Sequence, residues 1–141
     1  MSALPGSILF LCGQNAIRSP MAEALARAHL PRSVLVRSAG LRSGQRDPFV
    51  DAVLAEVDVP LEEHEPRALD DLEDDLFDVV VTLTPEAAER ADVMARTIPI
   101  EVVRWTIEDP SLVEGRRDQR IEAYRAVRDR LDALIRERFG L

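Results

Sequence analysis

The sequence contains no lysine, because all 18 of its basic residues are arginines. This excludes a lysine Schiff base and the lysine-bearing phosphate loop of nucleotide hydrolases. Its one cysteine, Cys12, leaves no partner for an internal disulfide and excludes a multi-cysteine zinc site. The two histidines, His29 and His64, stand far apart and form no metal-binding motif. We therefore expect no metal and no cofactor, and a single unpaired cysteine is typical of a reducing compartment.

Positive charge and long hydrophobic runs are also scarce. The 26 acidic residues outnumber the basic ones and give a net charge of −8, which disfavours a nucleic-acid or membrane-surface binder. The apolar run near the N-terminus is too short for a signal peptide or membrane span, and no basic region precedes it. We expect a cytoplasmic protein with one domain over residues 1–141, either a monomer or a weak homodimer.

Four short apolar runs predict strands that are covered on both faces, as in a parallel sheet. They span residues 8–11, 34–36, 79–83 and 100–103. Helical patterns lie between them and after them. Their predicted starts are Ser19-Pro20, with Ser19 as the cap, Asp47-Pro48 and Thr84-Pro85, followed by a long helix over 118–139 and a short one near 69–72.

This alternation predicts an α/β fold, a doubly wound parallel sheet with helices on both faces. Ligands bind such sheets at the carboxyl ends of the strands. Four loops are expected to gather at that edge, beginning at Cys12, Ala39, Thr84 and Trp105.

The loop after the first strand carries the predicted chemistry. Cys12 follows the strand, and Arg18 stands six residues later, where a helix begins. Such a loop can curl around an oxyanion with its backbone N–H groups and the helix N-terminus, while Arg18 offers a bidentate fork. The same field stabilises a thiolate. The alternative is a buried, inert Cys12 beside a solvated Arg18.

Two Asp-Pro pairs are candidates for a proton donor to the leaving oxygen. Asp47 opens a predicted helix and is interpreted as its cap. Asp109 lies in the loop after the fourth strand, at the edge that holds Cys12, where a carboxyl group can reach a leaving group. The alternative for Asp109 is a plain turn residue.

The segment Cys-Gly-Gln-Asn-Ala-Ile-Arg-Ser-Pro-Met-Ala-Glu-Ala from Cys12 resembles the signature of the low-molecular-weight protein tyrosine phosphatases, a family related to thioredoxin-linked arsenate reductases. Further similar segments are Ser-Ala-Gly from Ser38, Phe-Asp from Phe77 and Glu-Asp-Pro from Glu108. The resemblance spans nearly the whole chain in the right order.

The resemblance implies a four-stranded parallel sheet and a phosphatase without metal that acts through a phosphocysteine. Cys12 would be the nucleophile, Arg18 the phosphate ligand and Asp109 the general acid and then base. The implied second shell is Asn15, Ser19 and Ser38. The implied substrate-binding loop comprises Gly13, Gln14, Asn15, Ala16, Ile17, Arg18 and Ser19.

The sequence departs from the family pattern at several positions. Gln14 replaces the usual glycine before the loop asparagine, and Ile17 replaces a frequent second cysteine. Ser111 and Leu112 replace the aromatic residues that often follow the Asp-Pro pair.

We therefore expect hydrolysis of a phosphoprotein or a small phosphomonoester. One alternative is arsenate reduction with an external thiol, since the chain lacks the cysteines for an internal disulfide relay. The other alternative is a phosphate-binding regulatory module with little turnover.

Overall fold

The computed structural model of the protein describes residues 4–61, 64–72 and 76–141. Its strands are β1 (Ser7–Cys12), β2 (Leu35–Gly40), β3 (Val79–Thr82) and β4 (Glu101–Arg104). Its helices are α1 (Arg18–His29), α2 (Pro48–Ala55), α3 (Pro85–Ala95) and α4 (Arg117–Phe139), with short 3₁₀ turns η1 (Leu69–Asp71) and η2 (Pro110–Leu112).

The strands form one parallel sheet in the order β2-β1-β3-β4. In the register of the sheet, Ile8 of β1 lies opposite Val36 on one side and Val79 on the other. The chain starts in the middle of the sheet, winds outward to β2, and then crosses back to β3 and β4. The four-stranded, doubly wound α/β fold predicted from the sequence is confirmed.

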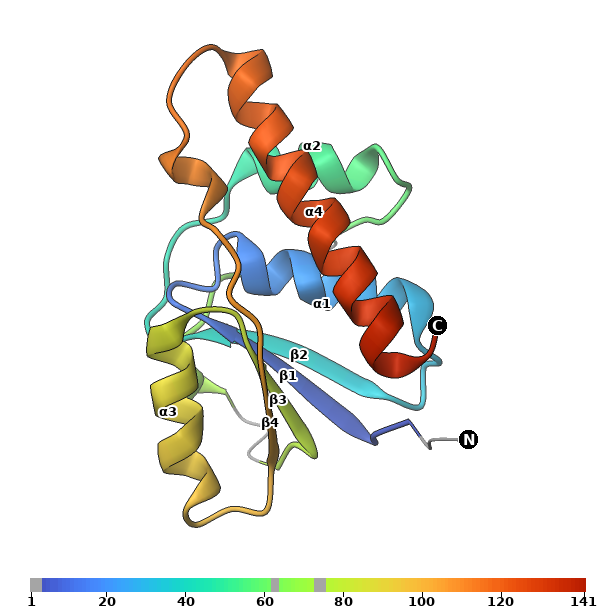
Figure 1. Ribbon diagram of the computed structural model, residues 1–141, viewed down its shortest axis with the longest axis vertical. Helices are drawn as coiled ribbons and strands as arrows, with labels where there is room; N and C mark the ends of the chain where they lie inside the picture. Colours follow the sequence, from blue (N-terminus) through green and yellow to red (C-terminus); the bar gives the residue numbers. More distant parts are fainter. Residues whose placement is uncertain (1–3, 62–63, 73–75) are drawn as a thin grey trace.

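Alternate residues of the central strands pack into two hydrophobic layers. Phe10 faces the layer formed with α1, α2 and α4, whereas Leu9 and Leu11 face the layer that includes Ala87 and Ala91 of α3. Figure 1 shows α3 on one side of the sheet and α1 and α4 on the other. Within the described residues, no helix is long and apolar enough to cross a membrane.

Of the two predicted helix caps, Asp47 is confirmed and Ser19 is wrong. Asp47 accepts a hydrogen bond from the N–H of Phe49, and Thr84 likewise caps α3. The cap of α1 is Ile17, without a side-chain hydrogen bond, and Ser19 lies inside the first turn. The hydroxyl of Ser19 is engaged with Cys12 instead, so a tertiary contact overrides the local capping preference.

The second strand is longer than its apolar run. The run over 34–36 predicts its start, but β2 continues through polar Ser38 to Gly40. Ser38 is fully buried, and its hydroxyl accepts a hydrogen bond from the Asn15 side chain in the loop that follows β1. The predicted short helix near 69–72 is the 3₁₀ turn η1.

Candidate active site

A cavity of about 240 Å³ lies at the carboxyl ends of the strands. The loops after β1, β2 and β4 all contribute to it, as the topology predicts. No described residue of the loop after β3 lines the cavity, but Glu86 in the first turn of α3 pairs with the lining residue Arg42. The lining residues are Cys12, Gly13, Gln14, Ala16, Ile17, Arg18, Arg42, Asp109 and Ser111.

Cys12 is the last residue of β1, and only 2% of its surface is exposed. Its sulfur lies 2.9 Å from the Ser19 hydroxyl oxygen. The backbone N–H of Asn15 donates to the same sulfur over 3.3 Å. These two contacts come from the loop that follows Cys12 and from the first turn of α1.

Asn15 holds the loop in its curled shape. Its φ of 55° places it in the left-handed region, where asparagine is among the better-tolerated residues. Its side-chain amide donates to the hydroxyls of Ser19 at 2.8 Å and Ser38 at 2.9 Å. Its side-chain oxygen accepts from the N–H of Arg67 at 3.0 Å. The buried Asn15 amide thereby connects the loop after β1 with α1, with β2 and with the segment at Arg67.

His64 is a supporting residue that the sequence analysis did not identify. One ring nitrogen lies 3.3 Å from the carbonyl oxygen of Asn15, and the other lies 3.9 Å from a carboxylate oxygen of Glu23. Both side chains are buried, and burial lowers the pKa of His64. A histidine in an acidic, irregular segment gives no periodic or motif signal, so only the tertiary contact reveals this position.

Two glycines allow the end of β2 and the loop after it to approach the loop after β1. A Cβ at Gly40 would lie 2.6 Å from the nitrogen of Asn15 and 2.5 Å from the carbonyl oxygen of Arg42, too close for any side chain. Gly44 accommodates Gln14, since a Cβ there would lie 2.8 Å from the Gln14 side chain. Gln14 itself is outside the positive-φ region, so replacing the family's glycine strains no backbone.

Arg18, the first residue of α1, joins the cysteine loop to the loop that carries Asp109. It donates to the carbonyl oxygen of Ile107 at 3.0 Å. In the described part of the chain, no carboxylate lies within ion-pair distance of Arg18. Its guanidinium therefore keeps donors for an anion in the cavity.

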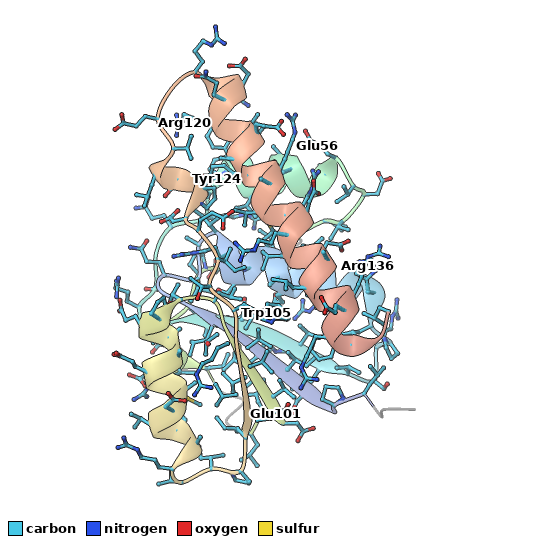
Figure 2. All side chains as sticks on the ribbon, in the orientation of Figure 1. Glu56, Glu101, Trp105, Arg120, Tyr124 and Arg136 are labelled. Carbon is cyan, nitrogen blue, oxygen red and sulfur yellow. The ribbon has the colours of Figure 1, made fainter. Side chains whose placement is uncertain are left out.

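Asp109 caps η2 and is held by its neighbour Ser111. One carboxylate oxygen of Asp109 accepts from both the N–H of Ser111 at 2.9 Å and its hydroxyl at 2.6 Å. Figure 2 shows Arg120 and Tyr124 on the first turns of α4, which packs against η2. Burial and a 2.6 Å hydrogen bond to Asp47 raise the pKa of Tyr124, so this hydroxyl stays protonated.

The predicted site residues separate into two layers. Gly13, Gln14, Ala16 and Ile17 line the cavity together with the three predicted catalytic residues, whereas Asn15, Ser19 and Ser38 lie beneath it. Trp105 packs against Phe10 at 6.4 Å between ring centroids and lines no part of this cavity. Among the described residues, no three His, Cys, Asp or Glu side chains converge as metal ligands.

A parallel doubly wound sheet with a cysteine loop at the end of its first strand defines the class of this protein. The family model of the low molecular weight phosphotyrosine protein phosphatases matches residues 7–139, and the chain belongs to this family.

Similar proteins carry more than one activity in their names. An arsenate reductase of Shouchella clausii is 30% identical over 133 residues, covering 92% of each chain. The YwlE arginine phosphatase of Geobacillus stearothermophilus is 26% identical, with a TM-score of 0.79 over 96% of this chain and 92% of its own. The tyrosine phosphatase amsI of Erwinia amylovora has a TM-score of 0.77 at 24% identity, covering 96% and 91%, which shows a shared fold.

Proposed function

We propose that this enzyme hydrolyses phosphate monoesters through a phosphocysteine at Cys12. The observation that carries the proposal is that Cys12, Arg18 and Asp109 line one cavity. A nucleophile, an anion ligand and a carboxyl group are the three parts that this reaction needs. The substrate is a phosphorylated protein or a small phosphomonoester, and the single free thiol suits a reducing cytoplasm.

In the first step, the thiolate of Cys12 attacks phosphorus and the bond to the leaving oxygen breaks. Arg18 and the N–H groups of the loop bind the equatorial oxygens, whose charge they stabilise. Asp109 gives its proton to the leaving oxygen, so that an alcohol departs rather than an alkoxide. The Ser111 contacts hold one carboxylate oxygen of Asp109 and leave the other for this proton.

In the second step, water hydrolyses the phosphocysteine. Asp109, now ionised, takes a proton from the attacking water, and the S–P bond breaks. Inorganic phosphate leaves, and the thiolate of Cys12 is restored. The Ser19 hydroxyl at 2.9 Å and the Asn15 N–H at 3.3 Å stabilise this thiolate as a leaving group.

Arsenate reduction with an external thiol is the second candidate, favoured by the names of curated relatives. The thiolate of Cys12 would displace one arsenate oxygen, which leaves as water, to form an S–As(V) bond. An external thiol would then attack the cysteine sulfur and break this bond, whose electron pair passes to arsenic. Arsenic gains two electrons and leaves as arsenite, while the two sulfurs become a mixed disulfide that a second thiol reduces. An internal relay is excluded, because the chain has no other cysteine.

Hydrolysis of p-nitrophenyl phosphate at mildly acidic pH tests the proposal, with Cys12→Ser in parallel. We expect turnover by the wild-type chain and its loss in the variant. Phosphotyrosine and phosphoarginine peptides extend the panel, because both classes of phosphatase occur among the structural neighbours.

A glutathione-dependent arsenate assay on the same preparations separates the alternatives. Arsenite formation without phosphate release would favour the reductase. Anion binding with neither activity would favour a phosphate-binding module, and Gln14→Gly would then test whether the departure at this position prevents turnover.

A further inference from the structure

We propose that Arg42 is a specificity-determining residue that selects phosphopeptides with an acidic residue next to the phosphorylated one. The inference rests on the proposed function, because it concerns what the same cavity binds. Among the described residues that line this cavity, the cations are Arg18 and Arg42. It comes from the loop after β2, and the family signature does not contain it.

The backbone of Arg42 is fixed against the cysteine loop. Its N–H donates to the carbonyl oxygen of Gly13 at 3.0 Å, directly beside Cys12. A Cβ built at Gly13 would lie 3.9 Å from Nη2 of Arg42, so the guanidinium follows the wall of the cavity. When a phosphopeptide binds with its phosphoryl group at Cys12, the residues next to the phosphorylated one therefore lie near this guanidinium.

The guanidinium remains available to a substrate. Nη1 donates to Glu86 at 3.2 Å, and these two side chains are 59% and 60% exposed. Exposed ion pairs of this kind contribute little, so a substrate carboxylate can replace Glu86. In the described regions, Nη2 has no acceptor within hydrogen-bond distance. A planar guanidinium accepts a carboxylate with two parallel hydrogen bonds.

The neighbouring Arg46 illustrates the opposite case. It donates to both carboxylate oxygens of Asp51 at 3.1 and 2.7 Å, and its Nη1 donates to the carbonyl oxygen of His64 at 3.0 Å. Its donors hold the loop together, and it does not line the cavity. Of the two arginines in this loop, Arg42 is the one placed for a ligand.

The charge of the whole chain makes a local cation matter. A net charge of −8 repels acidic peptides in general. Selection for an acidic neighbour therefore requires a positive group at the mouth of the cavity. Arg18 is committed to the phosphoryl group in the proposed mechanism, which leaves Arg42 for the second charge.

Binding to a Cys12→Ser chain tests the inference without requiring turnover. Two fluorescent phosphotyrosine peptides are compared that differ only in having Asp or Asn on both sides of the phosphotyrosine. We expect the Asp peptide to bind about three-fold more tightly, the size of one exposed charge contact. Adding Arg42→Gln should bring the ratio of the two dissociation constants to about one.

Two further variants sharpen the measurement. Glu86→Gln releases Arg42 and should raise the ratio. Arg136→Gln is the matched control, since Arg136 is 53% exposed and pairs with Asp132 at 2.9 Å. It lies near the C-terminal end of α4. This substitution removes the same charge and should leave the ratio as it was.

The inference is overturned by equal affinity for the two peptides, by a preference that survives Arg42→Gln, or by failure of both peptides to bind. Turnover of p-nitrophenyl phosphate by the wild-type chain is measured separately. Its absence contradicts the proposed hydrolysis, while the ratio of dissociation constants still decides the role of Arg42.

Discussion

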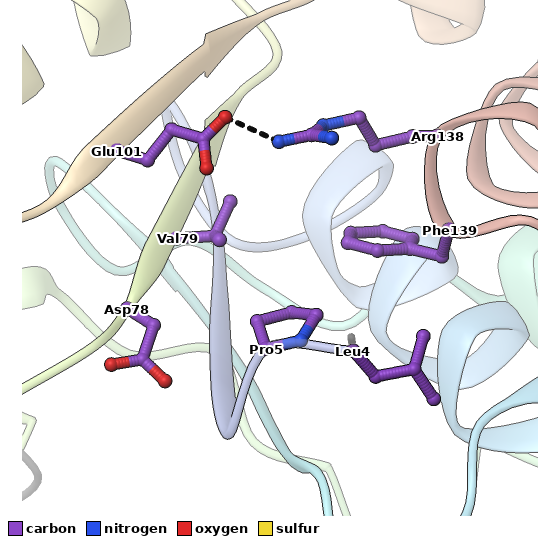
Figure 3. Close-up of a pocket in the computed structure, with 7 residues that line it drawn as sticks. All are labelled: Leu4, Pro5, Asp78, Val79, Glu101, Arg138 and Phe139. Carbon is purple, nitrogen blue, oxygen red and sulfur yellow. Dashed lines mark hydrogen bonds and ion pairs between the residues drawn. The ribbon is translucent and has the colours of Figure 1, made fainter. Parts of the chain in front are cut away.

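The two ends of the sheet carry cavities that differ in what their charged groups do. The cavity at the amino ends, about 350 Å³, is larger than the candidate active site at about 240 Å³. Figure 3 shows its Arg138 paired with Glu101, above apolar Val79 and Phe139. Asp78 accepts from the N–H of Gly6 at 2.8 Å.

At the carboxyl ends, by contrast, Arg18 and Asp109 have no ion-pair partner among the described residues, whereas Arg42 pairs with Glu86. Arg18 is held by a carbonyl oxygen, and one oxygen of Asp109 is left outside the Ser111 contacts. The two cavities are therefore distinguished by the pairing of their polar groups and not by their volumes. Charges that neutralise each other are less available to a ligand, whereas charged groups without a partner remain available to bind one.

Removing one arginine at each end of the sheet should give the strongest contrast between the two cavities. Arg18→Ala should lower kcat/KM for p-nitrophenyl phosphate by about 10³-fold, the loss expected for a donor aimed at transition-state charge. Arg138→Ala should change it by less than about two-fold, because its partner is the exposed Glu101. Similar losses in the two variants would show that the comparison of the cavities is wrong.

The carboxyl group of Asp109 gives the next largest effect. Asp109→Asn should slow hydrolysis of phenyl phosphate by about 10²-fold and of p-nitrophenyl phosphate much less, because a poor leaving group needs the proton more. The wild-type rate should follow a bell-shaped pH profile with an acidic optimum, since Cys12 must be ionised and Asp109 protonated. Steady-state kinetics over a series of leaving groups measure this, and equal losses across the series would contradict the role of Asp109.

Two glycines, one at each end of the sheet, allow the two ends to be compared by the free energy of unfolding. Gly40→Ala forces a Cβ to within 2.6 Å of backbone and should lower the free energy of unfolding by about 1–3 kcal/mol, with at least about ten-fold lower activity. At the other end, a Cβ at Gly6 meets only the side-chain oxygen of Asp78 at 3.0 Å, which can turn aside. Urea unfolding of both variants measures the difference, and an equal or larger loss for Gly6→Ala would reverse the expected order.

The smallest effect is the pH dependence that His64 adds beneath the active site. Burial lowers its pKa, so the unfolded chain takes up the proton first as pH falls below about 6.5. Stability from His64 is full above that pH and decreases below it, by up to about 1.4 kcal/mol per pH unit, until folded His64 is protonated.

Unfolding at pH 7.5 and 5.5 measures this contribution, which His64→Gln should remove. His29→Gln is the matched control, because His29 lies on α1 against Asp132 of α4 and does not touch Asn15. An unchanged pH dependence in His64→Gln would refute the assignment.

The sequence was sufficient to predict the alternation of strands and helices, because hydrophobic periodicity and Asp-Pro or Thr-Pro starts are local signals. It also brought Cys12, Arg18 and Asp109 to one edge, since the carboxyl ends of parallel strands share an edge. These conclusions needed only the order of the elements and the residues at their ends.

The folded structure was needed to identify the supporting residue His64 and the arginine that reaches the cavity. Ser19 was expected to support the site and does contact the Cys12 sulfur, although it does not cap α1. His64, by contrast, contacts Asn15 across 49 positions of sequence. Of two similar arginines, Arg42 lines the cavity and Arg46 holds its own loop. Such hydrogen bonds depend on distances between segments remote in sequence, and these distances exist only once the chain has folded.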